Sequence, residues 1–471
     1  METIIVIVFV IGYLAITLEH NLKIDKLIPA LAMMAVLWAL IALDIDGFTT
    51  WFDSAAHSLV DGFAAFDHEH KLHLLEETLL HHLGKTAEIL FFLLGAMTIV
   101  EIIDYFDGFE TIKGFIKTKS KRKLLWLFSI LAFILSAIID NLTATIVLIT
   151  ILQKVIKDRE TKLWFAGIII IAANAGGAWS PIGDVTTTML WIGHKVSAAQ
   201  LIEHVLVPSI ICMILPTFIA SRQSIFKGKL ETPLEEDAEP KSKFGATMLY
   251  LGLGAIIFVP IFKTVTHLPP YVGMMLSLAL VATFAEIYSN AKFNITTVDG
   301  GESEAAGHHS PVHHSLSKIE LPSVLFFLGI LLAVAALESL GMLFNFAEGL
   351  DKVMPMLGTE SVGEKVSDLV ILILGVGSAV IHNVPLVAAS MGMFSVGEND
   401  PVWHFIAYSA GTGGSMLIIG SAAGVVAMGM EKIDFFWYFK KIAWLALVGF
   451  LGGAAAFILI RNFILIDKIP L

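Results

Sequence analysis

Cysteine and charged residues are scarce in this sequence, and each scarcity excludes a class of protein. Cys212 is the single cysteine among 471 residues, so no intramolecular disulfide can form and no metal site can be built from paired thiolates. Charged residues make up 15% of the chain, whereas typical soluble domains have about 25%. The net charge of −12 provides no basic surface of the kind that binds nucleic acid.

Apolar residues take the place of the missing charge. They make up 56% of the chain, and the mean hydropathy is +0.80. A water-soluble core of this size would leave a large apolar surface exposed, whereas a lipid bilayer tolerates it. The N-terminus lacks a basic region and a small-residue cleavage site, so residues 4–17 are predicted to be a retained first span. The sequence therefore predicts an all-α polytopic membrane protein.

Twelve apolar segments are long enough to enter a bilayer, where a helix needs about 20 residues. They fall into two sets of six, in residues 1–221 and 246–471, joined by a charged linker at 222–245. The fourth and fifth members of each set are too long or too interrupted for a simple span. The segments lie near 4–18, 27–43, 86–104, 124–157, 163–193 and 201–220, and near 246–262, 271–289, 322–344, 366–396, 402–430 and 435–460.

The placement of Lys and Arg predicts the topology, because basic residues mark cytoplasmic segments. Basic clusters at 113–123 and 154–162 flank the segment 124–157 on both sides. Both ends of this segment should therefore lie inside, which makes it a re-entrant helical hairpin with its tip near Asp140. This choice puts both termini outside (N-out, C-out) and most Lys and Arg inside. The matching hairpin at 366–396 should then open to the outside.

Three segments are predicted to lie outside the bilayer. Residues 44–85 form a long outer loop whose amphipathic stretch should follow the membrane interface, and residues 222–245 form the inner linker. Residues 290–320 form a polar inner loop rich in histidine, to which no role is assigned. The interfacial stretch is marked by Trp51, Phe52, Leu59, Phe63 and Phe66.

The two halves carry matching motifs in the same order. Three stretches of the first half recur in the second half at a nearly constant spacing, close to half the chain. A repeat of this kind, with hairpins of opposite orientation, is the plan of many inverted-repeat secondary transporters. The matches are Phe91–Gly95 with Phe326–Gly329, Ser136–Asn141 with Ser378–Asn383, and Gly176–Asp184 with Gly413–Ser421.

The segment 174–184 cannot run as a continuous helix. Pro181 removes a backbone donor, and three glycines weaken the helix around it. A helix broken at membrane depth leaves carbonyl groups that can coordinate a cation. The same reasoning applies to 413–421 in the second half. For its paired glycines, Gly413 and Gly414, the alternative role is close helix packing.

Hard oxygen ligands suited to an alkali cation gather at the predicted hairpin tips and broken helices. The acids Asp140 and Asp184 lie in the first half, whereas the second half supplies neutral groups. A charge near the bilayer centre costs at least ~2.5 kcal/mol on insertion scales, which argues against a purely structural role for these acids as helix N-caps. Glu338, inside the span 322–344, is a further candidate as a proton-linked or gating acid. The candidate ligands are Asp140, Asn141, Thr143, Asp184, Thr186, Thr187, Ser378, Asn383, Thr412, Ser415, Ser421 and Glu338.

No Lys or Arg lies in the middle of any predicted span. Buried acids without a basic partner must recruit a cation or stay protonated, because burial and mutual repulsion both disfavour the ionised form. Each acid can then hold either a metal ion or a proton, and this competition is sufficient for antiport. The sequence thus favours a cation/proton exchanger in which Asp140 and Asp184 hold the transported ions.

Three motifs resemble the NhaD-type sodium/proton antiporters of the ion transporter superfamily. They are Phe91–Glu101, Asp140–Thr145 and Asn174–Thr187, and the resemblance extends over nearly the whole chain. It implies a multi-pass homodimer of the bacterial inner membrane, with a scaffold and a moving transport domain, that exports Na+ or Li+ in exchange for protons and needs no cofactor. The family's ion-site residues correspond to Asp140, Asn141, Thr143, Asp184, Thr186, Ser378 and Asn383.

Three other classes of protein fit parts of the pattern. An anion carrier of the same superfamily, for arsenite, citrate or a dicarboxylate, would prefer neutral hairpin tips and a positive countercharge, and Asp140 and Asp184 argue against it. An intramembrane enzyme would need a nucleophile with a base, or a metal motif such as HExxH within a span, and the sequence has neither. A passive channel would not show saturable exchange that depends on a proton gradient.

Overall fold

The computed structural model describes residues 1–53, 58–114, 116, 118–230, 244–296, 310–353 and 366–463. Helices dominate these residues, and one short antiparallel pair joins β1 (Phe52–Asp53) to β2 (Ser58–Leu59). The α-helices are α1 (Glu2–Thr17), α2 (Glu19–Leu22), α3 (Leu27–Leu43), α4 (His68–Tyr105), α5 (Glu110–Lys113), α6 (Lys121–Ile139), α7 (Asn141–Val155), α8 (Arg159–Ala178), α9 (Val185–Ile192), α10 (Ala198–Ser221), α11 (Gly245–Thr266), α12 (Pro270–Thr296), α13 (Pro311–Lys318), α14 (Leu321–Ser339), α15 (Met342–Val353), α16 (Asp368–Ile381), α17 (Asn383–Met393), α18 (Pro401–Gly413), α19 (Ala422–Glu431), α20 (Phe435–Lys441) and α21 (Ala443–Phe463). Short 3-10 helices cover Ile45–Gly47, Phe63–Ala65 and Ser224–Phe226.

Eight helices in the described part of the chain are long and apolar enough to cross a bilayer. They are α4, α6, α8, α10, α11, α12, α14 and α21. Because α-helices satisfy their own backbone hydrogen bonds, they are one of the few structures that can span hydrocarbon. The prediction of an all-α polytopic membrane protein is confirmed.

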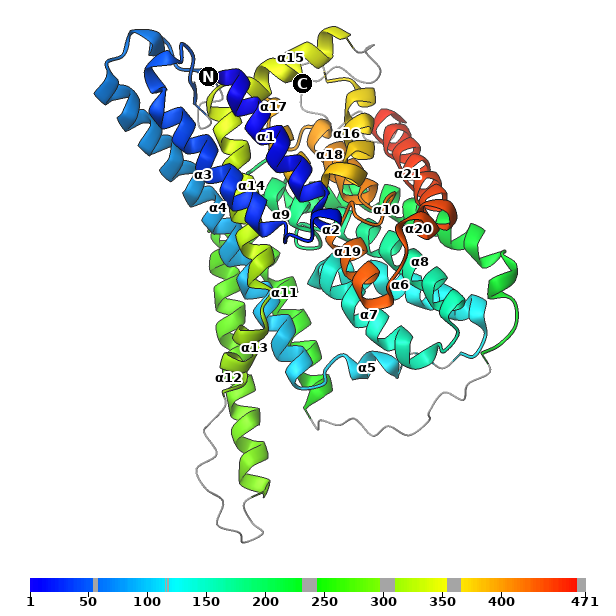
Figure 1. Ribbon diagram of the computed structural model, residues 1–471. Helices are drawn as coiled ribbons and strands as arrows, with labels where there is room; N and C mark the ends of the chain where they lie inside the picture. Colours follow the sequence, from blue (N-terminus) through cyan, green and yellow to red (C-terminus); the bar gives the residue numbers. More distant parts are fainter. Residues whose placement is uncertain are drawn as a thin grey trace.

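The helices pack in two groups that lie side by side (Figure 1). The frame helices are α1, α3, α4, α11, α12 and α14, in which α3 packs on α14 and α12 packs on both α11 and α4. The hairpin group comprises α6 to α10 and α16 to α21, in which α8 contacts α6 and α10 packs along α21. The two groups meet where α4 and α14 contact α9 and α17.

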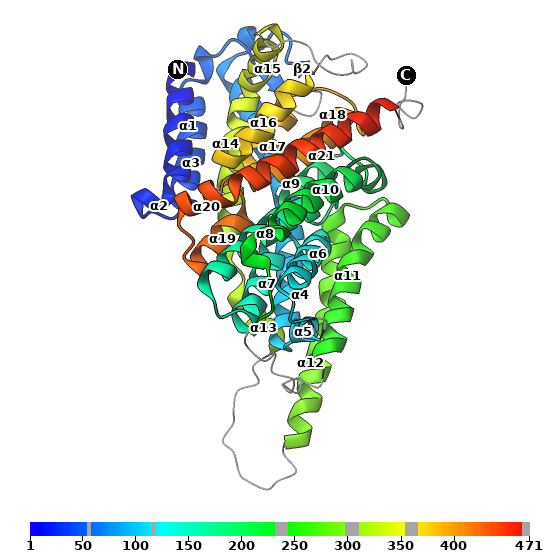
Figure 2. The same ribbon diagram turned by 90° about the vertical axis from the view of Figure 1, so that its right-hand side faces the viewer.

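Two helical hairpins face in opposite directions within the hairpin group. Hairpin 1 consists of α6 and α7 and turns at Asp140, while hairpin 2 consists of α16 and α17 and turns at His382. In Figure 1 the open end of hairpin 1 lies at the bottom and that of hairpin 2 at the top. These two sides are called the hairpin 1 face and the hairpin 2 face below. Met1 and the end of α21 both lie on the hairpin 2 face (Figure 2).

The prediction of an outer loop at 44–85 is wrong for residues 68–85, which form the first part of α4. The helix α4 begins at His68, where Asp67 caps it by accepting a hydrogen bond from the His70 N–H at 2.8 Å. No proline interrupts the following residues, and the buried side chains Lys71 and Leu75 keep the helical spacing of the span that follows. The loop is therefore limited to residues 44–67.

The aromatic residues of this loop also depart from the predicted position at the membrane interface. Trp51, Phe52 and Phe63 are almost completely buried, and the Trp51 and Phe63 rings stack at 5.4 Å. The Phe52 ring stacks on Phe344 of α15 at 5.9 Å. The loop is thus a small packed cap on the hairpin 2 face, because burying these rings against protein is worth more than their partial exposure to lipid headgroups.

Parts of the two predicted inner segments have regular structure. The helix α12 continues to Thr296 and α13 occupies 311–318, so His313 and His314 are helical, whereas His308 and His309 lie outside the described residues. In the linker predicted at 222–245, Lys229 bridges to Ser120 before hairpin 1, and 231–243 lie outside the described residues.

A buried ion pair ties the last helix to hairpin 2. The Arg461 guanidinium donates to both carboxylate oxygens of Asp368, at 2.7 and 2.6 Å. We expect Arg461→Met alone to destabilise the fold by about 3–5 kcal/mol, because it leaves the Asp368 charge buried and unpaired. The double variant Arg461→Met with Asp368→Leu should recover most of this loss. Thermal unfolding in detergent measures both, and a double variant as unstable as the single one would contradict this interpretation.

Candidate ion-binding site

The tip of hairpin 1 holds Asp140 in an unusual backbone conformation. Its φ is +72° and its ψ 162°, a region that residues with a side chain rarely adopt and that costs on the order of 1–3 kcal/mol. Its carboxylate accepts hydrogen bonds from the Thr143 N–H at 2.8 Å and from the Thr143 hydroxyl at 3.0 Å. Asp140 therefore caps α7, and the strain is consistent with a functional constraint.

Asp184 lies at the break between α8 and α9 and is almost completely buried, with 2% of its surface exposed. One carboxylate oxygen accepts from the Thr186 N–H and the Thr186 hydroxyl, both at 2.8 Å, so Asp184 caps α9. The side-chain amide of Asn141, at the tip of hairpin 1, also donates to Asp184. The amide of Asn383, at the tip of hairpin 2, donates at 3.2 and 3.3 Å. The tips of both hairpins thus meet on one carboxylate.

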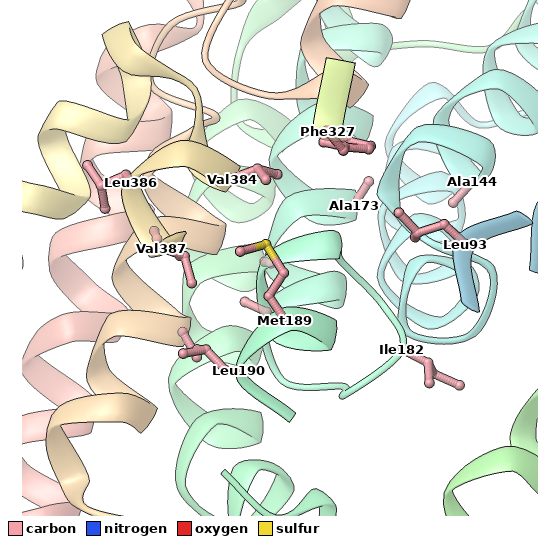
Figure 3. Packing of buried hydrophobic residues seen from close by; sticks show 14 of the residues in the cluster. Leu93, Ala144, Ala173, Ile182, Met189, Leu190, Phe327, Val384, Leu386 and Val387 are labelled. Atoms are coloured by element: carbon pink, nitrogen blue, oxygen red, sulfur yellow. The ribbon is translucent and has the colours of Figure 1, made fainter. Parts of the chain in front are cut away.

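Asp140 and Asp184 line one small cavity of about 20 Å³. This volume holds roughly one water-sized particle. The other lining residues are mostly apolar and include Leu93 of α4 and Ile182 of the α8–α9 break. Figure 3 shows these two side chains on one side of Met189 of α9. A bare cation or a proton fits this space, whereas an organic anion does not.

Helix N-termini offset part of the negative charge at the site. The helices α7 and α17 begin at the two hairpin tips, and α9 and α19 begin at the two broken helices. The N-terminus of a helix carries a partial positive charge of about +0.5, which stabilises a nearby carboxylate. Among the described residues neither Asp140 nor Asp184 forms an ion pair with Lys or Arg. A full positive charge therefore has to come from outside the chain.

Three of the candidate residues in the second half direct their hydroxyl groups to their own helix or turn. Ser378 donates to the Gly375 carbonyl at 2.7 Å, Thr412 to the Tyr408 carbonyl at 2.6 Å and Ser415 to the Thr412 carbonyl at 2.6 Å. In the first half, Thr187 donates to the Asp184 carbonyl at 2.9 Å. These hydroxyls lie near the helix breaks but make no hydrogen bond with the side-chain carboxylate of either acid.

Glu338 lies away from the two aspartates. It stands near the end of α14 and lines a separate cavity of about 330 Å³ at the hairpin 2 face, together with Lys85 and Lys195. Its carboxyl group packs against Gly392 of hairpin 2, where an added Cβ would lie 3.0 Å from the carboxyl carbon. The structure therefore does not bring Glu338 into the cluster formed by the other acids.

His382 occupies the tip of hairpin 2 at the position that matches Asp140. Its φ of +73° is nearly the same as that of Asp140, so both tips share one backbone conformation. The imidazole does not cap α17, and neither ring nitrogen has a hydrogen-bond partner. The neighbouring Asn383 carries another unpartnered group, its buried Oδ1 atom. A buried oxygen acceptor beside a carboxylate is a suitable cation ligand.

Asn174 is a residue of the site that was not among the ligands predicted from the sequence. It is fully buried in α8, and its amide donates to the Ser421 hydroxyl at 2.9 Å and to the Ile170 carbonyl at 3.1 Å. Its Oδ1 accepts from the Asn141 amide at 3.1 Å. Asn174 thus joins the tip of hairpin 1 to the second broken helix. The sequence feature that could have identified it is a side-chain amide within the apolar run that precedes Gly176.

We expect Asn174→Ala to weaken sodium binding by about tenfold. The change removes two side-chain hydrogen bonds that hold Asn141 and Ser421, each worth about 0.5–1.5 kcal/mol. The apparent KM for Na+ in vesicles measures the effect. Ser277→Ala is the matched control, because this buried hydroxyl donates to the Ala255 carbonyl at 2.7 Å between two frame helices. Equal KM values for both variants would show that Asn174 does not organise the site.

Comparisons with known proteins identify the family of the chain. Residues 7–404 match the citrate transporter family. Sodium/proton antiporters 1 and 2 of Arabidopsis thaliana are 39% and 36% identical to this chain, each over 97% of it, and the matches cover 72% and 99% of those proteins. The Na+/H+ antiporter NhaD of Vibrio parahaemolyticus is 33% identical over 80% of the chain and 91% of its own length. The chain therefore belongs to the citrate transporter family and, within it, to the NhaD-type sodium/proton antiporters.

Proposed function

We propose that this protein is a secondary antiporter that exports Na+ or Li+ in exchange for H+, with Asp140 and Asp184 as the shared binding groups. The observation that carries the proposal is the meeting of both hairpin tips on Asp184, in a cavity that Asp140 also lines. Transport of this kind needs no cofactor, and the cation is the cargo. The relatives named above are antiporters, which supports a transporter rather than an enzyme.

Exchange follows from competition for the two carboxylates. A bound Na+ offsets one of the two negative charges and can take oxygen ligands from Asp184, Asp140 and the free Oδ1 of Asn383. Protons neutralise the same oxygens, so a carboxylate holds one cargo or the other. Moving an empty site with two negative charges through a low-dielectric core has a high free-energy cost. The cost is lower when the site holds a cation or protons. This difference couples the two ions.

We also propose that residues 1–221 and 246–471 are inverted repeats joined by the linker 222–245, with both termini outside. The opposite directions of the two hairpins support this, as do matched close contacts. A Cβ on Gly176 would overlap the Phe133 carbonyl oxygen, and one on Gly413 would overlap the Gly375 carbonyl oxygen, at the corresponding place in each half. Alternating access then arises when the hairpin group moves against the frame helices.

Two further predictions accompany this proposal. We expect a homodimer in which the two protomers contact each other through their frame helices, because this arrangement leaves the hairpin group free to move. Location in a bacterial inner membrane stays a prediction, because the relatives come from a plant as well as from bacteria.

Anion transport is the second candidate function, and the description of the matching family as citrate transporters favours it. Citrate carries several negative charges, and the two aspartates would repel it unless both were protonated. A cavity of about 20 Å³ is also too small for a tricarboxylate. The site therefore supports a cation over citrate.

Inverted vesicles loaded with a pH-sensitive dye test the choice of substrate. A proton gradient is first established, and Na+, Li+, K+ or citrate is then added. We expect Na+ or Li+ to release protons from the vesicles in a saturable manner and citrate to have no effect. Proton movement on addition of citrate alone, or sodium movement that is not accompanied by opposite proton movement, would contradict the proposed function.

A further inference from the structure

A third cavity, of about 420 Å³ and called the large cavity below, lies at the hairpin 1 face between a frame helix and a hairpin helix. One wall is the end of α4, and the other is α7 of hairpin 1. Its mouth is bordered by residues beside α5 and α13, at the bottom of Figure 1. Because the two walls belong to different groups of helices, movement of hairpin 1 against α4 would change the width of this cavity.

One stripe of α4 leads from this cavity to the ion site. Leu93 and Met97 line the small cavity that holds Asp140 and Asp184. Met97, Glu101 and Asp104 line the large cavity. These positions are three or four residues apart, so they stand above one another on one helix face. Met97 is the one lining residue that the two cavities share.

The opposite wall reaches the same place. Thr143 and Thr150 of α7 line the large cavity and are separated by two helical turns. The Thr143 hydroxyl donates to Asp140 at 3.0 Å. Two threonine side chains therefore lie on the α7 side of the cavity, the inner one bonded to the carboxylate, and Met97 lines both this space and the ion cavity.

The charge of the large cavity favours cations. Its lining includes five carboxylates and one ammonium group, so cations are concentrated in it and anions are repelled. The cavity at the hairpin 2 face, in contrast, shares no lining residue with the ion cavity, and its two lysines, Lys85 and Lys195, are matched by two glutamates, Glu338 and Glu398. The charged residues of the large cavity are Glu101, Asp104, Asp107, Glu110, Glu320 and Lys318.

We propose that the large cavity is the aqueous route by which the cation passes between Asp140 and the hairpin 1 face, and that Met97 is the side chain that closes its inner end. The inference rests on the proposed antiport and adds its access path and gate. An unbranched thioether suits this position, because it can change rotamer without a cost in polar contacts. In this conformation the ion cavity borders the hairpin 1 cavity at Met97, which closes the passage between them, and it borders no part of the hairpin 2 cavity.

The single, buried cysteine makes this proposal testable by thiol labelling. Cys212 is 1% exposed, so a Cys212→Ser background should react little with a membrane-impermeant maleimide. Single cysteines are then placed at Thr150 and Met97, with Ala96→Cys as a second position on the ion cavity. Glu398→Cys, on the hairpin 2 cavity, is the control for sidedness. Oriented vesicles receive the reagent on one face at a time.

We expect Thr150→Cys to react rapidly from the hairpin 1 face only, and Glu398→Cys from the hairpin 2 face only. Met97→Cys and Ala96→Cys should react more slowly from the hairpin 1 face. With Na+ at ten times its dissociation constant, about a tenth of the molecules remain empty, so labelling of Met97→Cys should slow about tenfold while that of Thr150→Cys stays unchanged.

Labelling of Thr150→Cys from both faces, or from the hairpin 2 face, would overturn the route. The role of Met97 as the gate would be overturned if Na+ slowed the labelling of neither Met97→Cys nor Ala96→Cys. Labelling does not require turnover, so its failure is distinguishable from failure of the antiport itself. Vesicles that label as expected but exchange no ions would contradict only the proposed function.

Discussion

Replacing Asp184 by asparagine should abolish sodium-driven proton movement, with a loss of at least about a hundredfold in rate. The variant keeps the shape of the side chain and removes its charge. In this variant the bound cation would lack the Asp184 carboxylate as its counter-charge. Loss of one partner of a buried charge pair costs about 3–5 kcal/mol, and each 1.4 kcal/mol corresponds to a factor of ten. The fold should survive, because the Thr186 N–H and hydroxyl can still donate to the remaining amide oxygen.

Asp158→Asn is the matched control for this variant. Asp158 also caps a helix, by accepting a hydrogen bond from the Thr161 N–H at 2.8 Å, but it lies exposed at the start of α8. The hydrogen bonds from Thr161 lower the pKa of Asp158, so it is ionised at neutral pH. Asparagine caps helices nearly as well as aspartate, so exchange should be unchanged. If both variants exchanged ions at the wild-type rate, Asp184 would be only a helix cap.

Gly176→Ala should destabilise the protein by about 3 kcal/mol and prevent exchange. A Cβ at this position would overlap the backbone carbonyl of Phe133 in hairpin 1. Backbone atoms cannot rotate aside as the end of a flexible side chain can, so the cost lies at the upper end of the range for overpacking. Thermal unfolding in detergent measures the loss of stability, and the dye assay measures exchange.

Gly84→Ala provides the comparison for this effect. Gly84 is exposed within α4, and a Cβ there would have no neighbour within 4 Å. Alanine should raise stability slightly, by about 0.5–1 kcal/mol, because it lowers the entropy of the unfolded chain. A Gly176→Ala protein as stable as Gly84→Ala would show that α8 and hairpin 1 do not need such close approach.

The helix breaks could be predicted from the sequence because their causes are local. Pro181 and the surrounding glycines interrupt α8 and α9, and the turn of hairpin 1 falls at Asp140, where its tip was expected. The start of α4 could not be predicted from the sequence, because the histidine and glutamate residues in 68–85 suggested a polar loop. The helix begins at His68 because Asp67 caps it and because the buried residues that follow keep the helical spacing. A short polar stretch can extend a span beyond the hydrocarbon as one continuous helix.

The arrangement of the site was only partly predictable, because it depends on contacts between distant residues. The repeat marked Asn141 and Asn383 as equivalent, but periodicity cannot tell that both amides donate to Asp184 rather than each to its own half. The serine and threonine hydroxyls near the breaks looked equally suited to a cation, yet several bond to carbonyls one turn away. Such local bonding is common for these residues in helices.

The energetics of the site explain why the chain tolerates two acids in its core. The N-terminus of α9 and the amides of Asn141 and Asn383 stabilise the ionised Asp184, while no Lys or Arg among the described residues fixes it permanently. A permanent ion pair would hold the carboxylate in one state and block exchange. Partial compensation keeps the site stable enough to fold and open to a cation or a proton.

Calorimetric titration of the purified protein with Na+ at several pH values tests the central claim, that cation and proton compete for Asp140 and Asp184. We expect sodium binding to release protons and the apparent affinity for Na+ to fall about tenfold for each unit by which the pH is lowered, once protons occupy the site. Both effects should disappear in Asp184→Asn. Sodium binding of equal affinity at acid and alkaline pH, without proton release, would contradict it.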